Sequence, residues 1–122
     1  MRTVAARTAS RSRTSTTLRT RHRDAGDAWV LELSGEADIT TVHLLTRELD
    51  RLVDRHPRRV VVELADLTFC DVRSASLILQ MAHTVPVELS GAAGPVKRVL
   101  DLLLPVERPP GGRVLTDVSA VS

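Results

Sequence analysis

The segment from Arg58 to Met81 constrains the fold of this chain most, because its pattern is that of a buried strand followed directly by a helix. Val60–Leu64 begins with three β-branched residues, a run that suits a strand covered on both faces. After a turn at residues 65–68, apolar residues recur at positions 75, 78, 79 and 82, the spacing of one helix face. A buried strand that leads into a helix predicts an α/β unit, with the rest of the chain packed on it.

Weaker patterns on either side extend this unit into a small domain. Strands are predicted at residues 28–33 and 86–90. Helices are predicted from Thr41 to about residue 55 and from Pro95 to Leu104, because Pro57 and Pro105 disfavour a continued α conformation just before them. Strands that alternate with helices favour parallel pairing. We therefore expect a single α/β domain over residues 24–106, with a mostly parallel β-sheet and helices packed on one face.

Composition excludes several classes of protein. Trp29 and Phe69 are the only aromatic residues, so the chain lacks the stacking platforms that bind single-stranded nucleic acid, and no specific nucleic-acid partner is expected. No apolar run approaches the ~18 residues of a membrane helix, so no membrane partner is expected either. The single cysteine, Cys70, cannot form an internal disulfide, which fits a reducing compartment and predicts a cytoplasmic protein.

The positive charge of the chain is concentrated at its N-terminal end. Residues 1–23 contain seven Arg and no acidic residue, which leaves ten basic and fifteen acidic residues, a net charge of −5, in the remainder. This composition predicts a disordered basic tail. Non-specific contact with nucleic acid or an anionic membrane remains an alternative, and so does an organelle transit peptide. At the other end, residues 107–122 are expected to be a flexible segment, with an edge strand over residues 113–118 as the alternative.

No group of residues in the sequence supports enzyme chemistry. Cys70, Asp71 and His83 could suggest a nucleophile and a base, but nothing in their spacing positions the imidazole, and Cys70 is better explained as a small buried side chain. The four His residues lack the spacing of a metal site. The loop Gly91–Gly94 lacks the Gly-Lys-Ser/Thr ending of a phosphate-binding loop. We therefore expect no enzyme activity, no catalytic residue, no cofactor and no metal.

The predicted helix after Cys70 carries the clearest binding signal. Asp71 can accept hydrogen bonds from the free N–H groups of the first turn and cap the helix. A rotation of 100° per residue places the apolar positions 75, 78, 79 and 82 on the core face and positions 73, 77, 80 and 84 opposite, with 76 and 81 at the margins. Leu77 and Met81 then lie on the exposed side, where either the tail of this chain or a partner covers them.

Three segments of the chain carry a resemblance to a known family. Residues 71–74, Asp-Val-Arg-Ser, follow a Val-rich strand and resemble the Asp-Ser-Ser-Gly segment of the STAS family, the sulphate-transporter and anti-sigma-factor-antagonist domain. Residues 35–39, Gly-Glu-Ala-Asp-Ile, are similar to the segment after the family's first long strand, and residues 94–100 resemble its last well-marked helix. The order and spacing of the three segments cover roughly Asp24 to Val106.

The resemblance implies a function in bacterial transcription control. It implies an anti-sigma factor antagonist that binds an anti-sigma factor of the GHKL-kinase type, and it leaves a weak homodimer open. Arg73 occupies the position of the serine that partner kinases phosphorylate, and Ser74 is the only plausible substitute acceptor nearby. A STAS-type sensory or scaffold module, which binds a ligand or a larger signalling complex, is the alternative. The residues expected at the partner surface are Asp71, Arg73, Ser74, Leu77, Gln80 and Met81.

Overall fold

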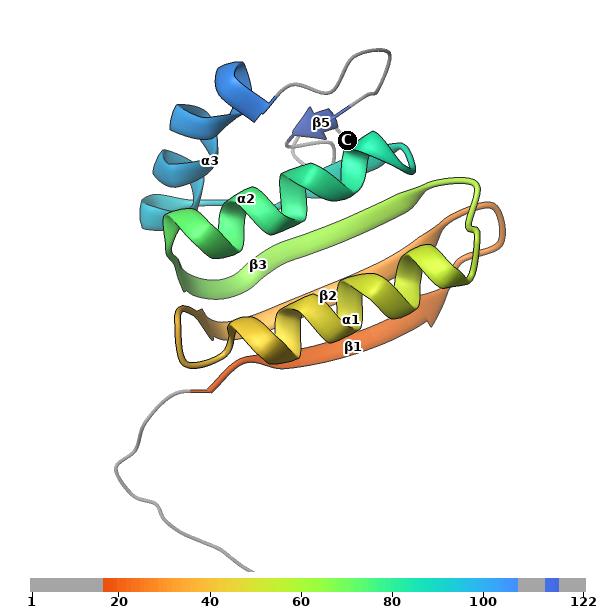
Figure 1. Cartoon of the computed structure of the whole chain (residues 1–122), viewed down its shortest axis with the longest axis horizontal. Coiled ribbons are helices and arrows are strands. Elements are labelled where there is room, and N and C mark those ends of the chain that lie inside the picture. Colours follow the sequence, from red (N-terminus) through yellow and green to blue (C-terminus); the bar gives the residue numbers. More distant parts are fainter. Residues whose placement is uncertain (1–16, 108–113, 117–122) are drawn as a thin grey trace, which may run out of the picture.

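The computed structural model describes residues 17–107 and 114–116. Within these residues, strands and helices alternate after an initial pair of strands (Figure 1). The strands are β1 (Arg19–Asp24), β2 (Trp29–Ala37), β3 (Val60–Cys70), β4 (Val87–Ser90) and β5 (Val114–Thr116). The helices are α1 (Val42–Asp54), α2 (Val72–Gln80) and α3 (Gly94–Glu107), and a short 3₁₀ turn, Met81–His83, follows α2.

The five strands of the described residues form one sheet in the order β1-β2-β3-β4-β5, which is also their order in the sequence. β1 pairs with β2 antiparallel, and each later pair is parallel. Successive right-handed crossovers that advance in one direction place every connecting helix on the same face of the sheet. Figure 1 shows α1 and α2 on one side of β2 and β3. The predicted α/β domain with a mostly parallel sheet and helices on one face is confirmed.

The two faces of β3 differ in burial, and this corrects one prediction. Val60, Val62 and Leu64 are fully buried in the layer between sheet and helices. Val61 and Glu63 point to the other face and are half-buried. The run of β-branched residues had suggested a strand covered on both sides. With all three crossovers on one face, none of the described helices covers the opposite face of β3.

One hydrophobic core joins the helices to the sheet. From α1 it contains Leu45, Leu49 and Leu52, which recur at four- and three-residue spacing on one helix face. Asp38 and Thr40, which precede α1, do not cap it. Instead the Asp38 carboxylate accepts hydrogen bonds from the backbone N–H and the hydroxyl of Thr40, at 2.9 and 2.6 Å, in the turn before the helix. The cap residue is Thr41, and its side chain makes no capping bond.

The strand β1 corrects the predicted extent of the N-terminal tail. Residues 19–23 were assigned to a disordered tail, but Arg19–Asp24 pairs with β2 along its whole length. The domain therefore begins before residue 24, and Leu18 is already part of the core. Residues 1–16 of the predicted tail lie outside the described residues.

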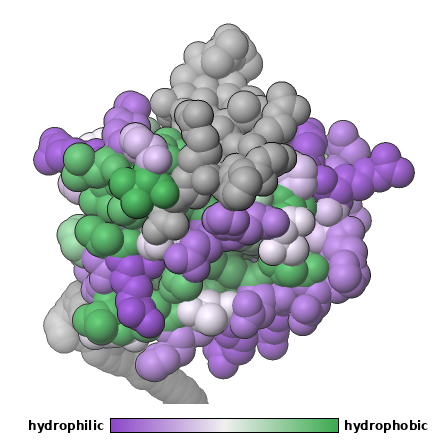
Figure 2. All heavy atoms as spheres, turned by 45° about the horizontal axis from the view of Figure 1, so that its top comes forward, coloured by the Kyte–Doolittle hydropathy of each residue, from purple (hydrophilic) through white to green (hydrophobic). Residues whose placement is uncertain are grey.

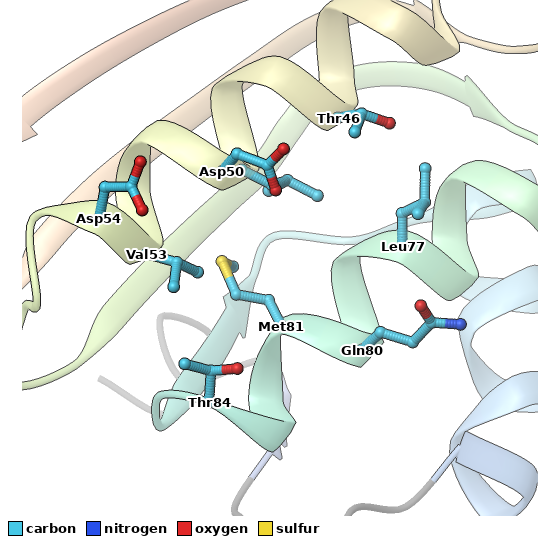
Figure 3. Close-up of a pocket in the computed structure, with 9 residues that line it drawn as sticks. Thr46, Asp50, Val53, Asp54, Leu77, Gln80, Met81 and Thr84 are labelled. Carbon is cyan, nitrogen blue, oxygen red and sulfur yellow. The ribbon is translucent and has the colours of Figure 1, made fainter.

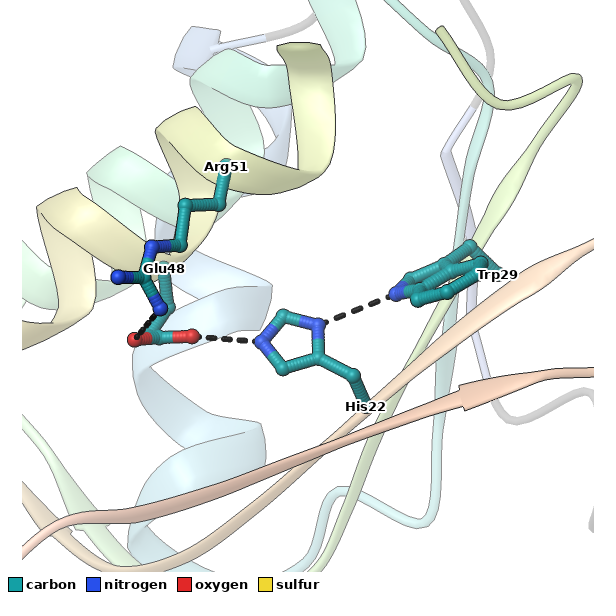
Figure 4. A network of polar contacts seen from close by, with 4 residues as sticks. All are labelled: His22, Trp29, Glu48 and Arg51. Atoms are coloured by element: carbon teal, nitrogen blue, oxygen red, sulfur yellow. Dashed lines mark hydrogen bonds and ion pairs between the residues drawn. The ribbon is translucent and has the colours of Figure 1, made fainter. Parts of the chain in front are cut away.

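A polar network fixes β1 to the helical layer (Figure 4). The indole N–H of Trp29 donates to Nδ1 of His22 at 3.1 Å. Because an indole nitrogen can only donate, the proton of the neutral imidazole lies on Nε2, which donates to the buried carboxylate of Glu48 at 2.6 Å. Glu48 also pairs with Arg51 at 3.7 Å, and the guanidinium of Arg55 stacks over Trp29, 4.4 Å from the ring centre.

The C-terminal part departs from the predicted boundaries at α3. This helix was expected to end by Leu104, but it continues through Pro105 to Glu107. A proline near the end of a helix removes only one backbone hydrogen bond, which the last turn tolerates better than the middle. The edge-strand alternative for residues 113–118 holds over Val114–Thr116, which pairs with β4. Residues 108–113 and 117–122 lie outside the described residues.

Candidate functional site

Asp71 fixes the start of α2 in the way that the sequence predicts. Its backbone is extended, with φ −82° and ψ 173°, and its side chain accepts a hydrogen bond from the backbone N–H of Ser74 at 2.8 Å. Its carbonyl oxygen accepts from the N–H of Ala75 at 3.0 Å, and its own N–H donates to the carbonyl oxygen of Ala37 at 3.0 Å. The predicted helix cap is confirmed. The link to Ala37 also holds the first turn of α2 against the end of β2.

Three exposed apolar side chains come from the elements that meet at this edge of the sheet. Ile39 follows β2, Phe69 is near the end of β3, and Val72 begins α2; they are 70%, 41% and 60% exposed. Because β2 and β3 are parallel, their carboxyl ends lie at the same edge. Figure 2 shows apolar residues gathered on the left-hand side of the molecule, the side on which α2 begins and α3 lies in Figure 1. None of these three residues was among those predicted at the partner surface. The sequence does contain a feature that could have indicated them: each is an apolar residue outside the apolar helix faces, in or next to residues 35–39 or 71–74.

The exposed residues of α2 continue this surface. Arg73 and Gln80 are exposed, and Leu77 is half-buried because it also packs against the core from the helix margin. The Nε2 group of Gln80 donates to the hydroxyl of Ser76, one turn earlier, at 3.0 Å. We call Ile39, Phe69, Val72, Arg73, Leu77 and Gln80, together with Asp71, the α2 surface.

Two residues of the predicted partner surface lie inside the molecule. Met81 is 5% exposed and Ser74 is 0% exposed, so neither offers side-chain area to a partner. Met81 falls in the 3₁₀ turn after α2, where each residue advances by about 120° instead of 100°, and this moves its side chain toward the core. The hydroxyl of Ser74 is buried and has no hydrogen-bond partner among the described residues. A kinase could reach that hydroxyl only if the first turn of α2 opened.

A groove of about 440 Å³ lies between α1 and α2 (Figure 3). Its apolar lining consists of Leu49 and Val53 from α1, Leu77 from α2 and Met81 from the turn that follows. Figure 3 shows Leu77 extending toward α1 and the side chains of Val53 and Met81 pointing toward one another. Its polar lining is Thr46, Asp50, Asp54, Gln80 and Thr84. The groove therefore borders the α2 surface and carries two carboxylates.

The environment of Cys70 opposes thiol chemistry. Burial, and secondly the nearby charge of Asp71, raise the pKa of the Cys70 thiol to about 12. The thiol donates a weak hydrogen bond to the carbonyl oxygen of Asp71 at 3.6 Å. Because the thiolate is the nucleophilic form, a thiol that stays protonated at neutral pH is inert. The structure thus places Cys70 as a small buried residue at the strand end, as the sequence indicates.

Residues 17–107 and 114–116 contain no cluster of three or more His, Cys, Asp or Glu side chains that could hold a metal ion. Among the helices of these same residues, none is both long enough and apolar enough to cross a membrane.

Comparison with known proteins adds a family model and several similar structures. Residues 20–121 match the family model described as Mlab, STAS domain. The chain resembles the crystal structure of an anti-sigma factor antagonist from Mycobacterium paratuberculosis, with a TM-score of 0.66 and 17% identity over 85% of this chain and 90% of that one.

Two further structures extend the comparison. The anti-sigma factor antagonist SpoIIAA in its unphosphorylated form has a TM-score of 0.62 and 15% identity, over 84% of this chain and 91% of that one. A protein from Shewanella loihica with a SpoIIAA-like fold has a TM-score of 0.54 and 10% identity, over 89% and 92% of the two chains. At these identities the likeness shows the fold. No curated protein matches the sequence.

Proposed function

Because this chain belongs to the STAS domain family, we propose that it is a cytoplasmic protein-binding module that acts as an anti-sigma factor antagonist in a bacterium. Its partner is an anti-sigma factor of the GHKL-kinase type, which it binds through the α2 surface. By occupying that partner, the chain releases a sigma factor.

The observation that carries this proposal is the apolar patch around the start of α2. Ile39, Phe69 and Val72 are large apolar side chains, exposed together at one edge of the sheet, with Asp71 and Arg73 beside them. Exposed apolar residues grouped on a monomer and bordered by polar ones are typical of protein interfaces. The Asp71 cap and its backbone link to Ala37 hold this patch on rigid elements, which lowers the ordering cost of binding.

We further propose that phosphorylation does not switch this interaction at the usual position. A phosphate would add about −1.5 to −2 charges at the N-terminus of α2, in the middle of the α2 surface. Arg73, at that position, cannot accept a phosphate, and the hydroxyl of Ser74 is buried. Binding is therefore constitutive, or controlled through the amount of protein made.

A second function, a scaffold module within a larger complex, is favoured by one specific observation. The family model that matches is described as Mlab, STAS domain, and not as an antagonist. The absence of a phosphorylatable residue at position 73 agrees with a module that is not switched by a kinase. In this alternative the same α2 surface contacts another subunit.

The test is a binding experiment with Val72→Asp. Val72 is exposed at the first position of α2, where a carboxylate suits the helix dipole, so the fold should persist. A charge desolvated in the apolar contact should reduce affinity for the anti-sigma factor at least tenfold, which corresponds to ~1.4 kcal/mol. The matched control is Leu102→Asp, an equally apolar and exposed residue on α3. Leu77 suits this test less, because it also packs against the core.

Capture of partners from the native cell separates the two functions. Recovery of an anti-sigma kinase that Val72→Asp no longer retains supports the antagonist, and recovery of a multisubunit assembly supports the scaffold. Incubation of the captured kinase with ATP and this protein, followed by peptide mapping, should give no phosphate on Ser74 or Ser76. Stoichiometric phosphate on either would overturn the claim of constitutive binding.

A further inference from the structure

The groove between α1 and α2 is lined by apolar residues and by carboxylates that have no ion-pair partner among the described residues. Leu49, Val53 and Leu77 form its apolar lining together with the edge of Met81, and Asp50 and Asp54 lie on its α1 side (Figure 3). Within residues 17–107 and 114–116, neither carboxylate forms an ion pair. No basic residue lines the groove itself. An adjoining hollow shares these two carboxylates and includes Arg47, Arg51 and Arg73.

We propose that the N-terminal segment of this same chain, residues 1–16, binds in this groove. The segment contains four Arg, at positions 2, 7, 11 and 13, and no acidic residue. Between the first two Arg it carries Val4-Ala5-Ala6, a short apolar stretch of small side chains. Guanidinium groups pair with carboxylates in a two-pronged geometry. The segment therefore matches both the charge and the apolar lining of the groove.

The point of attachment brings the segment within reach. The described chain begins at Thr17, and Leu18 lines a hollow together with Leu44 of the first turn of α1. α1 has 13 residues and so is about 20 Å long, at 1.5 Å per residue. Sixteen residues span up to roughly 55 Å when extended, more than twice that length. Every part of the groove along α1 is therefore accessible to the segment without any change in the domain.

Because the N-terminal segment is covalently joined to the domain, it is a better occupant of the groove than a separate basic peptide. A segment joined to its own binding site acts at an effective concentration on the order of millimolar. A free basic peptide at cellular concentration would have to bind much more tightly to compete. Asp50 and Asp54 are exposed, so both carboxylates are open to such weak intramolecular binding.

The consequence for function is self-masking, and this step rests on the proposed function. Leu77 and Gln80 line the groove and also belong to the α2 surface. A segment bound in the groove covers part of the surface that we assign to the partner. The two would compete, so the segment would set a threshold for partner binding.

The test uses the full chain and requires no partner. A nitroxide is attached at position 8 through Thr8→Cys, while the native Cys70 is buried and does not react with the label. We expect loss of NMR signal at Leu77 and Thr84, which line the groove, and none at Val61, on the opposite face of the sheet. Signal loss spread evenly over both faces would overturn the proposal.

Charge dependence is measured with a matched pair of variants. Asp50→Asn with Asp54→Asn should abolish the signal loss at Leu77. Asp27→Asn with Asp101→Asn removes the same charge away from the groove and should leave the signal loss unchanged. Raising the salt concentration from 0.15 M to 1 M shortens the Debye length from ~8 to ~3 Å and should act like the first pair. Equal signal loss in all variants would refute binding through these carboxylates.

A mixing experiment separates binding within one chain from binding between copies. Spin-labelled chain without isotope is added to isotope-labelled chain without a spin label. No signal loss at Leu77 is expected in the isotope-labelled copy. Signal loss there would show that the segment binds a second copy, which contradicts the intramolecular proposal. None of these outcomes depends on whether an anti-sigma factor binds, so failure here and failure of the proposed function are distinguishable.

Discussion

Replacing Ser74 with alanine is expected to make this protein more stable. The Ser74 hydroxyl is fully buried and has no hydrogen-bond partner among the described residues. A buried polar group left unsatisfied costs about 1–3 kcal/mol, and alanine removes that group. The helix cap survives, because Asp71 accepts from the backbone N–H of residue 74 and not from the hydroxyl.

The magnitude follows from three contributions. Loss of the unsatisfied hydroxyl gains about 1–3 kcal/mol, and the higher helix propensity of alanine adds at most ~0.7 kcal/mol. The void left by one oxygen atom is smaller than a methyl group and costs less than ~1 kcal/mol. The expected net gain in the free energy of unfolding is about 1–2 kcal/mol, which for a domain of this size raises the thermal midpoint by about 4–10 °C.

The assay is urea unfolding followed by circular dichroism, at constant m-value. The matched control is Ser76→Ala: Ser76 is half-buried, and its hydroxyl accepts from Gln80, so the change should stay within ~0.5 kcal/mol of zero. If Ser74→Ala instead lowers the free energy of unfolding by 1 kcal/mol or more, the hydroxyl has a partner and the reasoning is refuted.

Three further predictions concern the termini, a glycine and pH. Deletion of residues 1–16 should move the thermal midpoint by only a few degrees, whereas deletion of residues 1–24 removes β1 and should lower it sharply; equal effects would show that β1 adds no stability. Gly35→Ala should cost at least ~2 kcal/mol, since Gly35 has φ +92° and an added Cβ would lie 2.0 Å from the carbonyl oxygen of Thr17; an unchanged urea midpoint would contradict this. The pKa of Cys70 is raised to about 12, so above pH 9 the unfolded chain releases a proton that the folded chain keeps. The free energy of unfolding should therefore fall between pH 9 and 12, and fall less in Cys70→Ala.

The parts of the fold that rest on short-range patterns could be predicted from the sequence. The strand around Val62, the turn into α2 and the Asp71 cap are each determined by residues within a few positions of one another. The resemblance carried by residues 35–39, 71–74 and 94–100 supplied the order of the elements. These local patterns agree with each other, and such agreement allows the secondary structure of the segment to be predicted from its sequence.

The parts that depend on distant contacts could not be predicted. β1 has the sequence Arg-Thr-Arg-His-Arg-Asp, which has the composition of a solvated tail. It becomes a strand because β2 pairs with it and because Glu48 accepts a hydrogen bond from His22. The open face of the sheet, to which Val61 points, follows from the placement of all crossovers on the other side, and no single strand reveals this.

The candidate site was predicted in part, for similar reasons. Asp71, Arg73 and Gln80 lie on the surface as the helical projection indicates, and Leu77 lies at its margin. Met81 was misplaced because the projection assumed 100° per residue past Gln80, where the backbone tightens into a 3₁₀ turn. Phe69 and Val72 were missed because each belongs to the end of an element, where strand and helix periodicities no longer apply.

The agreement between the order of the strands in the sheet and their order in the sequence has a consequence for how this chain acquires its structure. Each strand from β2 to β5 pairs with the strand that precedes it in the sequence. No later segment therefore has to insert between two strands that are already paired. The β1–β2 hairpin closes a short loop. Each parallel pair closes a longer one, because Trp29, Val60, Val87 and Val114, paired in succession, are 31, 27 and 27 positions apart, and such pairings form more slowly than a hairpin. During synthesis, the partner of each new strand has therefore already been made, and we expect the sheet to grow from β1 toward β5 as the chain leaves the ribosome.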